Sequence, residues 1–160
     1  MKQILLNLLI IALLGVFGPA LADLSLVEVS PIGFGLILPN APASGGTVSI
    51  AKTNATRMVV SGNYVFAQTG TSGVYTITGG SASQHVNVAI TTPGTIANGG
   101  GPTLVINNFT TNTDSGTATG KVTLDSSGEF QLQIGCNLTL GANQAAGTYS
   151  GQLDVTLSPG

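Results

Sequence analysis

Apolar and polar residues alternate along most of the chain with the period of two that is typical of β-strands. In Phe130–Leu140 the even-numbered positions are apolar, except for the thiol of Cys136, and the odd-numbered positions carry Gln, Gly, Asn or Thr. Such runs are short and recur throughout the chain. The predicted strands are Leu24–Val29, Phe34–Leu38, Thr47–Ile50, Arg57–Val60, Val74–Thr78, His85–Ile90, Thr103–Phe109, Lys121–Leu124, Phe130–Leu140 and Tyr149–Leu157.

Gly, Asn, Ser and Pro separate these runs, and no segment after Ala22 has the apolar stripe of an amphipathic helix. Regularly spaced short strands with such turns indicate a β-sandwich or barrel. Residues Asp125–Glu129 are expected to connect their two neighbouring strands as a hairpin. There is no internal repeat and no long linker, so we expect one all-β domain over residues 23–160.

The N-terminus has the layout of a secretory signal peptide. Lys2 precedes an apolar stretch from Ile4 to Val16, and Ala20-Leu21-Ala22 offers small residues for cleavage. The alternative is a membrane-spanning helix, which needs about 20 apolar residues. Because this stretch is shorter, we expect residues 1–22 to be removed between Ala22 and Asp23. The mature chain would have 138 of the 160 residues, no membrane span, and a location in the periplasm, at the cell surface or outside the cell.

Charge is scarce. Only four Lys or Arg and six Asp or Glu occur in 160 residues, and the net charge is −2. This balance excludes a basic surface that follows nucleic-acid phosphates. It also disfavours catalysis by clustered ionisable groups. The low charge does not indicate disorder, because β-branched residues are abundant.

The only cysteine, Cys136, cannot form an internal disulfide. A single cysteine in an exported protein indicates an intermolecular bridge or a buried thiol. Its position on the apolar face of a predicted strand favours burial as a small hydrophobic residue.

Three candidate chemical sites are better explained as structure. His85 is the only histidine and is expected to point outward beside Asn87, without the partners that a metal or catalytic site needs. Asp114-Ser115-Gly116 matches an aspartic-protease loop in its letters, but no second copy exists, so a turn is expected. Asp125 and Glu129 are expected as solvated acids of a turn rather than a glycosidase pair. We therefore expect no catalytic, metal or cofactor-binding residue, and no enzyme.

One stretch near the C-terminus is distinctive. Residues 141–151 read Gly-Ala-Asn-Gln-Ala-Ala-Gly-Thr-Tyr-Ser-Gly and precede an alternating strand. Gly141 and Asn143 suit a turn with positive φ, and Tyr149 is expected to pack its ring while its hydroxyl reaches backbone or water. The stretch resembles the C-terminal signature of a bacterial secreted family, domain of unknown function 4402. Ile32–Gly35, Gly45–Ile50, Tyr75–Ile77 and Leu104–Phe109 extend the resemblance over residues 26–157.

The ending is also similar to that of spore-coat-protein-U and chaperone–usher pilin domains. That resemblance implies an immunoglobulin-like, pilin-like sandwich that lacks one strand and is completed by a strand from a partner. Like subunits, or a periplasmic chaperone and usher, would be the partners. The implied groove is lined by the apolar faces of the first and last strands: Phe34, Leu36, Leu153, Val155 and Leu157.

Two functions remain open. The first is a structural or adhesive surface subunit, such as a fimbrial subunit, that assembles by strand complementation. The alternative is a monomeric periplasmic or extracellular module that binds a glycan or a protein. Neither function needs a cluster of ionisable residues, so the low charge of the chain does not decide between them.

Overall fold

The computed structural model describes residues 23–40, 45–97 and 103–160, and in this part of the chain every regular element is a β-strand. The all-β prediction is confirmed. The strands are β1 (Ser25–Ser30), β2 (Ile32–Pro39), β3 (Gly46–Ile50), β4 (Arg57–Ser61), β5 (Tyr64–Phe66), β6 (Gly73–Thr78), β7 (His85–Ile90), β8 (Gly94–Ala97), β9 (Thr103–Thr111), β10 (Thr119–Thr123), β11 (Phe130–Leu140), β12 (Gly147–Gly151) and β13 (Val155–Pro159).

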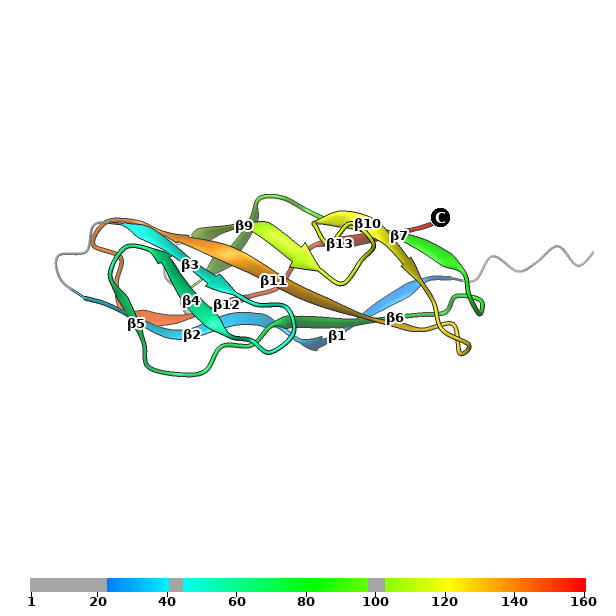
Figure 1. Cartoon of the computed structure of the whole chain (residues 1–160), viewed down its shortest axis with the longest axis horizontal. Coiled ribbons are helices and arrows are strands. Elements are labelled where there is room, and N and C mark those ends of the chain that lie inside the picture. The colour runs from blue at the N-terminus through cyan, green and yellow to red at the C-terminus, as the bar shows by residue number, and fades with distance from the viewer. Residues whose placement is uncertain (1–22, 41–44, 98–102) are drawn as a thin grey trace, which may run out of the picture.

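The strands form two antiparallel sheets in an elongated molecule (Figure 1). The larger sheet has the order β1-β6-β11-β9-β8-β12-β2-β5; in addition, β3 pairs with the second half of β11, and β4 pairs with β3. The smaller sheet has the order β10-β7-β13. A bridge between Gly33 of β2 and Thr71, just before β6, ties two distant parts of the larger sheet together. This sheet is therefore curled into a half-barrel.

One hydrophobic core joins both sheets. The alternation along β11 buries Leu132, Ile134, Cys136 and Leu138, as the sequence pattern predicts. Side chains of β7 in the smaller sheet belong to the same cluster. The expected burial of Cys136 is confirmed, and burial raises the pKa of its thiol to about 12. A thiolate is therefore strongly disfavoured in the folded chain.

The predicted strand set needs three corrections. The short strands β5 and β8 are missing from it, and the single strand predicted over Tyr149–Leu157 is two strands. The hairpin prediction at Asp125–Glu129 is wrong, because β10 pairs with β7 whereas β11 pairs with β3, β6 and β9. The connection carries the chain from one sheet to the other. It does contain a tight turn, in which the Asp125 carboxylate accepts hydrogen bonds from the N–H groups of Ser127 and Glu129.

Candidate functional site

The first strand, β1, and the last strand, β13, diverge into different sheets, and each lies at an edge of its sheet. β2 and β12 run side by side from Ile37–Gly147 to Ile32–Gly151. On the N-terminal side of β2, across Pro31, lies β1, which pairs with β6 in the larger sheet. On the C-terminal side of β12, after Asp154, lies β13, which pairs with β7 in the smaller sheet. We call this divergence the β1–β13 split; among the described residues, each of its two strands has only one neighbour.

Tyr75 holds the base of the split. It projects from β6, is 3% exposed, and its hydroxyl accepts a hydrogen bond from the Leu153 N–H at 3.3 Å. Burial raises the pKa of Tyr75, that hydrogen bond opposes the shift, and the charges of Glu28 and Asp154 add to it. Glu28 belongs to β1 and Asp154 directly precedes β13. The point at which β1 and β13 diverge is therefore near the Tyr75 hydroxyl.

Among residues 23–40, 45–97 and 103–160, no strand pairs with the second edge of β13, and half of the N–H groups of β13 point toward that edge. The Thr91 N–H bonds the Asp154 carbonyl, and the Gly160 N–H bonds the His85 carbonyl. Since bonded and non-bonded pairs alternate in an antiparallel ladder, the even-numbered residues of β13 bond β7. The N–H groups of Val155 and Leu157 thus point away from β7, toward the split.

The same alternation explains how a proline fits into β13. Pro159 is the last residue of this strand and pairs with Val86. Pro159 is odd-numbered, so its missing N–H lies on the side away from β7 and costs the ladder no hydrogen bond.

The predicted groove residues fall into two groups. Leu153, Val155 and Leu157 lie beside the split; Leu153 is buried, and the other two are half-buried against the core. Phe34 and Leu36 belong to β2, where β12 and β5 occupy both edges. Phe34 is fully buried and Leu36 is half-buried. The structure therefore brings the C-terminal members together and places the β2 members elsewhere.

The sequence reasoning missed the residues of β1 that border the split. Leu26 is half-buried against the core, and Glu28 shares its face of the strand. On the opposite face, Val27 and Val29 are 51% and 60% exposed. Alternation in the sequence indicated the strand, but it could not show that the strand would lie at a sheet edge.

The other candidate residues occupy ordinary structural positions. His85 is exposed, as predicted, and its Nδ1 lies 3.1 Å from the Thr123 hydroxyl. Asp114 forms the expected turn: its carboxylate accepts hydrogen bonds from the N–H groups of Lys121 and Ser115. These bonds, chiefly the one from Lys121, hold the pKa of Asp114 below its usual value.

The described part of the chain also bears on metal binding and on membrane spanning. Within the described ranges, no group of three or more His, Cys, Asp or Glu side chains could hold a metal ion. No helix in that part of the chain is long and apolar enough to cross a membrane. The expected signal peptide, residues 1–22, and with it Ala22, lie outside the described residues. Asp23 is the first described residue and is exposed.

The turn before β12 follows its sequence closely. Asn143 has a φ of 59°, as expected, whereas Gly141 is not in the positive-φ region. The Tyr149 side chain is fully buried. Its hydroxyl donates to the Ala145 carbonyl at 2.6 Å and accepts from the Gln144 amide at 3.1 Å. The distinctive run of residues 141–151 is thus a turn locked onto β12 by a tyrosine.

Comparison with known proteins identifies the family. The model of the family described as "Domain of unknown function (DUF4402)" matches residues 24–158, which include every strand described above except the end of β13. No curated protein and no solved structure matches the chain. The chain belongs to the DUF4402 family.

Proposed function

We propose that the protein is an exported, non-enzymatic surface subunit that assembles by strand complementation at the β1–β13 split. The observation that carries this proposal is the pair of strand edges that diverge from the β2–β12 pair and have no second neighbour among the described residues. An incoming extended segment would bond the N–H groups of Val155 and Leu157, which point away from β7. This is β-augmentation, in which the backbone supplies the affinity and alternate side chains supply the specificity.

The edge of β1 supports the same role. Natural edge strands are usually shielded by Lys, Pro, a bulge or a covering loop. β1 is six residues long, exposes Val27 and Val29, and has Glu28 as its only charged residue. Its one irregularity lies at the Glu28–Ser30 end. An edge with so little protection suits a strand that is covered in the assembled state.

Under this proposal the fold is an immunoglobulin-like, pilin-like sandwich with one strand missing. Tyr149 is consistent with such a fold, because tyrosine corners of immunoglobulin-type domains also return a buried hydroxyl to backbone a few residues upstream. β1 pairs within its own sheet, so the complementing segment would come from another subunit rather than from this strand. A periplasmic chaperone would occupy the same edge before assembly.

The test uses the alternation along β13. Val155→Pro removes an N–H that faces the split and leaves the bonds to β7 intact, as the natural Pro159 does. Val155→Ala is the matched control, because it shortens the same side chain and keeps the N–H. Surface material is sheared from cells that export each full chain, and its particle size is measured by sedimentation.

We expect high-mass particles from the wild type and from Val155→Ala, and only folded monomer from Val155→Pro. Circular dichroism and the unfolding midpoint of the purified variants confirm that each is folded. A wild-type chain that is recovered only as a stable monomer would contradict the proposal. So would a folded Val155→Pro chain that assembles like the wild type.

A further inference from the structure

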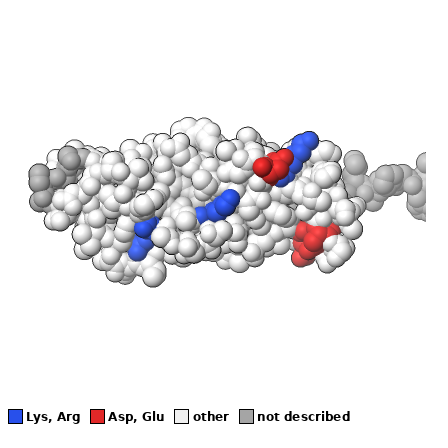
Figure 2. All heavy atoms as spheres, viewed as in Figure 1, with Lys and Arg blue, Asp and Glu red and all other residues white. Residues whose placement is uncertain are grey.

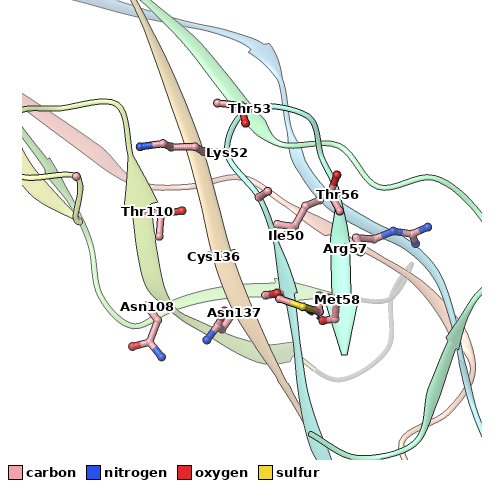
Figure 3. Close-up of a pocket in the computed structure, with 13 residues that line it drawn as sticks. Ile50, Lys52, Thr53, Thr56, Arg57, Met58, Asn108, Thr110, Cys136 and Asn137 are labelled. Atoms are coloured by element: carbon pink, nitrogen blue, oxygen red, sulfur yellow. Dashed lines mark hydrogen bonds between the residues drawn. The ribbon is translucent and has the colours of Figure 1, made fainter. Parts of the chain in front are cut away.

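A hollow of about 620 Å³ lies on the outer side of the larger sheet, between the β3–β4 connection and strands β9 and β11 (Figure 3). Its volume is within the range of small-molecule sites in proteins. Its lining combines apolar surface, to which the exposed Met58 belongs, with hydroxyl, amide and basic side chains. The residues that carry the argument are Lys52, Thr53, Met58, Asn108, Thr110 and Asn137.

The backbone is shaped to place Asn108 at this hollow. β9 has an extra residue opposite β11 between the pairs Thr110–Gly135 and Asn107–Asn137. Asn108 lies at this bulge with a φ of 49°, a left-handed conformation that is uncommon outside glycine. The bulge keeps Phe109 in the core and leaves the Asn108 side chain exposed at the hollow. Figure 3 shows the amides of Asn108 and Asn137 on neighbouring strands at one end.

A close approach of backbones places Lys52 at the other end. A Cβ atom on Gly135 would lie 2.4 Å from the Ile50 carbonyl oxygen and 2.6 Å from the Lys52 nitrogen, so only glycine lets the β3–β4 connection cross β11 here. The Lys52 ammonium group donates to the Thr111 carbonyl. An ammonium group has three N–H donors, and two remain for a ligand.

Charge selects the class of ligand. Without Lys2 of the expected signal peptide, the chain has three basic residues, and two of them, Lys52 and Arg57, line the hollow. No Asp or Glu is among the described residues that line it. On the visible face, Figure 2 shows the acidic atoms toward one end, some of them beside basic atoms, and the other basic atoms nearer the middle, away from any acidic atom. Figure 3 shows the Arg57 guanidinium directed away from Lys52 and the two amides; there it donates to the Phe34 carbonyl at 2.6 Å and stacks on the Phe66 ring. Lys52 is therefore the charge on the side of the hollow where the amides lie.

We propose that this hollow binds an oligosaccharide that carries carboxylate groups, such as a chain of uronic acids. Amides and hydroxyls both donate and accept, as sugar hydroxyls require. Met58, which is 63% exposed, offers apolar surface to the C–H face of a sugar ring. Lys52 provides the charge that favours a carboxylate over a neutral sugar. The lining lacks the pair of carboxyl groups that glycoside hydrolysis uses, so the site binds without cleaving.

The experiment titrates the purified processed chain with trigalacturonate and with neutral galactotriose, by calorimetry at low salt. Asn108→Gly removes one amide and keeps the left-handed backbone, and Asn137→Ala removes the other. Lys52→Met removes the charge. Lys121→Met, which removes the basic residue that does not line the hollow, is the matched control.

We expect trigalacturonate to bind more tightly than galactotriose. Each amide variant should weaken that binding about threefold to tenfold, the loss of one hydrogen bond. Lys52→Met should remove the preference for the acidic sugar, and Lys121→Met should change neither value. The proposal is overturned by absent binding, by equal affinity for both sugars, or by amide variants that bind like the wild type. Thermal unfolding of each variant shows that a loss of binding is not a loss of fold. The result is independent of strand complementation, because it is measured on the monomer.

Discussion

Two buried tyrosines provide a matched test of how the structure is held together. Tyr149 is fully buried and its hydroxyl makes two hydrogen bonds, to the Ala145 carbonyl and from the Gln144 amide. Tyr64 is 7% exposed, and its hydroxyl has no hydrogen-bond partner among the described residues. Replacing either residue with Phe removes one oxygen atom, keeps the ring, and opens no large cavity.

The two substitutions should therefore differ in sign or size. Each hydrogen bond contributes about 0.5–1.5 kcal/mol net, so Tyr149→Phe should lower the free energy of unfolding by about 1–3 kcal/mol. Tyr64→Phe removes a buried hydroxyl that gains nothing in the folded state. It should leave the free energy unchanged or raise it by roughly 1 kcal/mol, because the desolvation of that hydroxyl is no longer needed.

The assay is urea unfolding of the purified processed chains, followed by circular dichroism and fitted with a common slope. Tyr149→Phe should reach its midpoint at a clearly lower urea concentration than the wild type, and Tyr64→Phe should not. Equal losses in the two variants would refute the reasoning, because the ring positions and not the hydroxyl contacts would then set the cost. A neutral Tyr149→Phe would show that water replaces the Ala145 and Gln144 contacts without penalty.

Three further predictions concern backbone, titration and processing. Gly35 has a φ of 63°, and a Cβ added to it would lie 2.4 Å from the Thr69 carbonyl oxygen. Gly35→Ala should therefore lower the free energy of unfolding, measured in urea, by at least about 1–3 kcal/mol. Gly141→Ala, whose Cβ would have no contact under 3.8 Å, should leave it nearly unchanged. The unfolded chain loses the Cys136 proton above about pH 9, and the folded chain keeps it toward pH 12. The free energy of unfolding should therefore fall by about 1 kcal/mol between pH 9 and pH 10, and Cys136→Ala should remove this contribution. Mass spectrometry of the exported chain should give Asp23 as its first residue, and an uncleaved N-terminus would contradict the signal peptide.

Periodicity predicted most of the strands because burial on one face leaves a clear alternation. It located β7 at its observed bounds and β11 with the correct buried face. It missed β5, which reads Tyr-Val-Phe and does not alternate, and β8, in which Ile96 is the one large apolar residue. It also joined β12 to β13, since Leu153 keeps the alternation while the chain crosses between sheets.

Pairing was harder to predict than the strands themselves. Asp125–Glu129 has the composition of a hairpin turn, yet its flanking strands belong to different sheets. Local turn chemistry is the same in both arrangements, so only the tertiary fold distinguishes them. The hollow escaped detection for a related reason. Asn108 and Asn137 occupy polar positions of ordinary strands, and their meeting depends on a bulge and on the register of β9 with β11.

Hydrogen exchange along β13 tests strand complementation most directly. In the isolated monomer, the Thr156 and Ser158 amides bond β7 and should be protected, while the Val155 and Leu157 amides face the split and should exchange quickly. In surface material sheared from the exporting cell, all four amides should be protected, because a partner strand bonds the second edge. Val155 and Leu157 amides that exchange as quickly in that material as in the monomer would contradict the account.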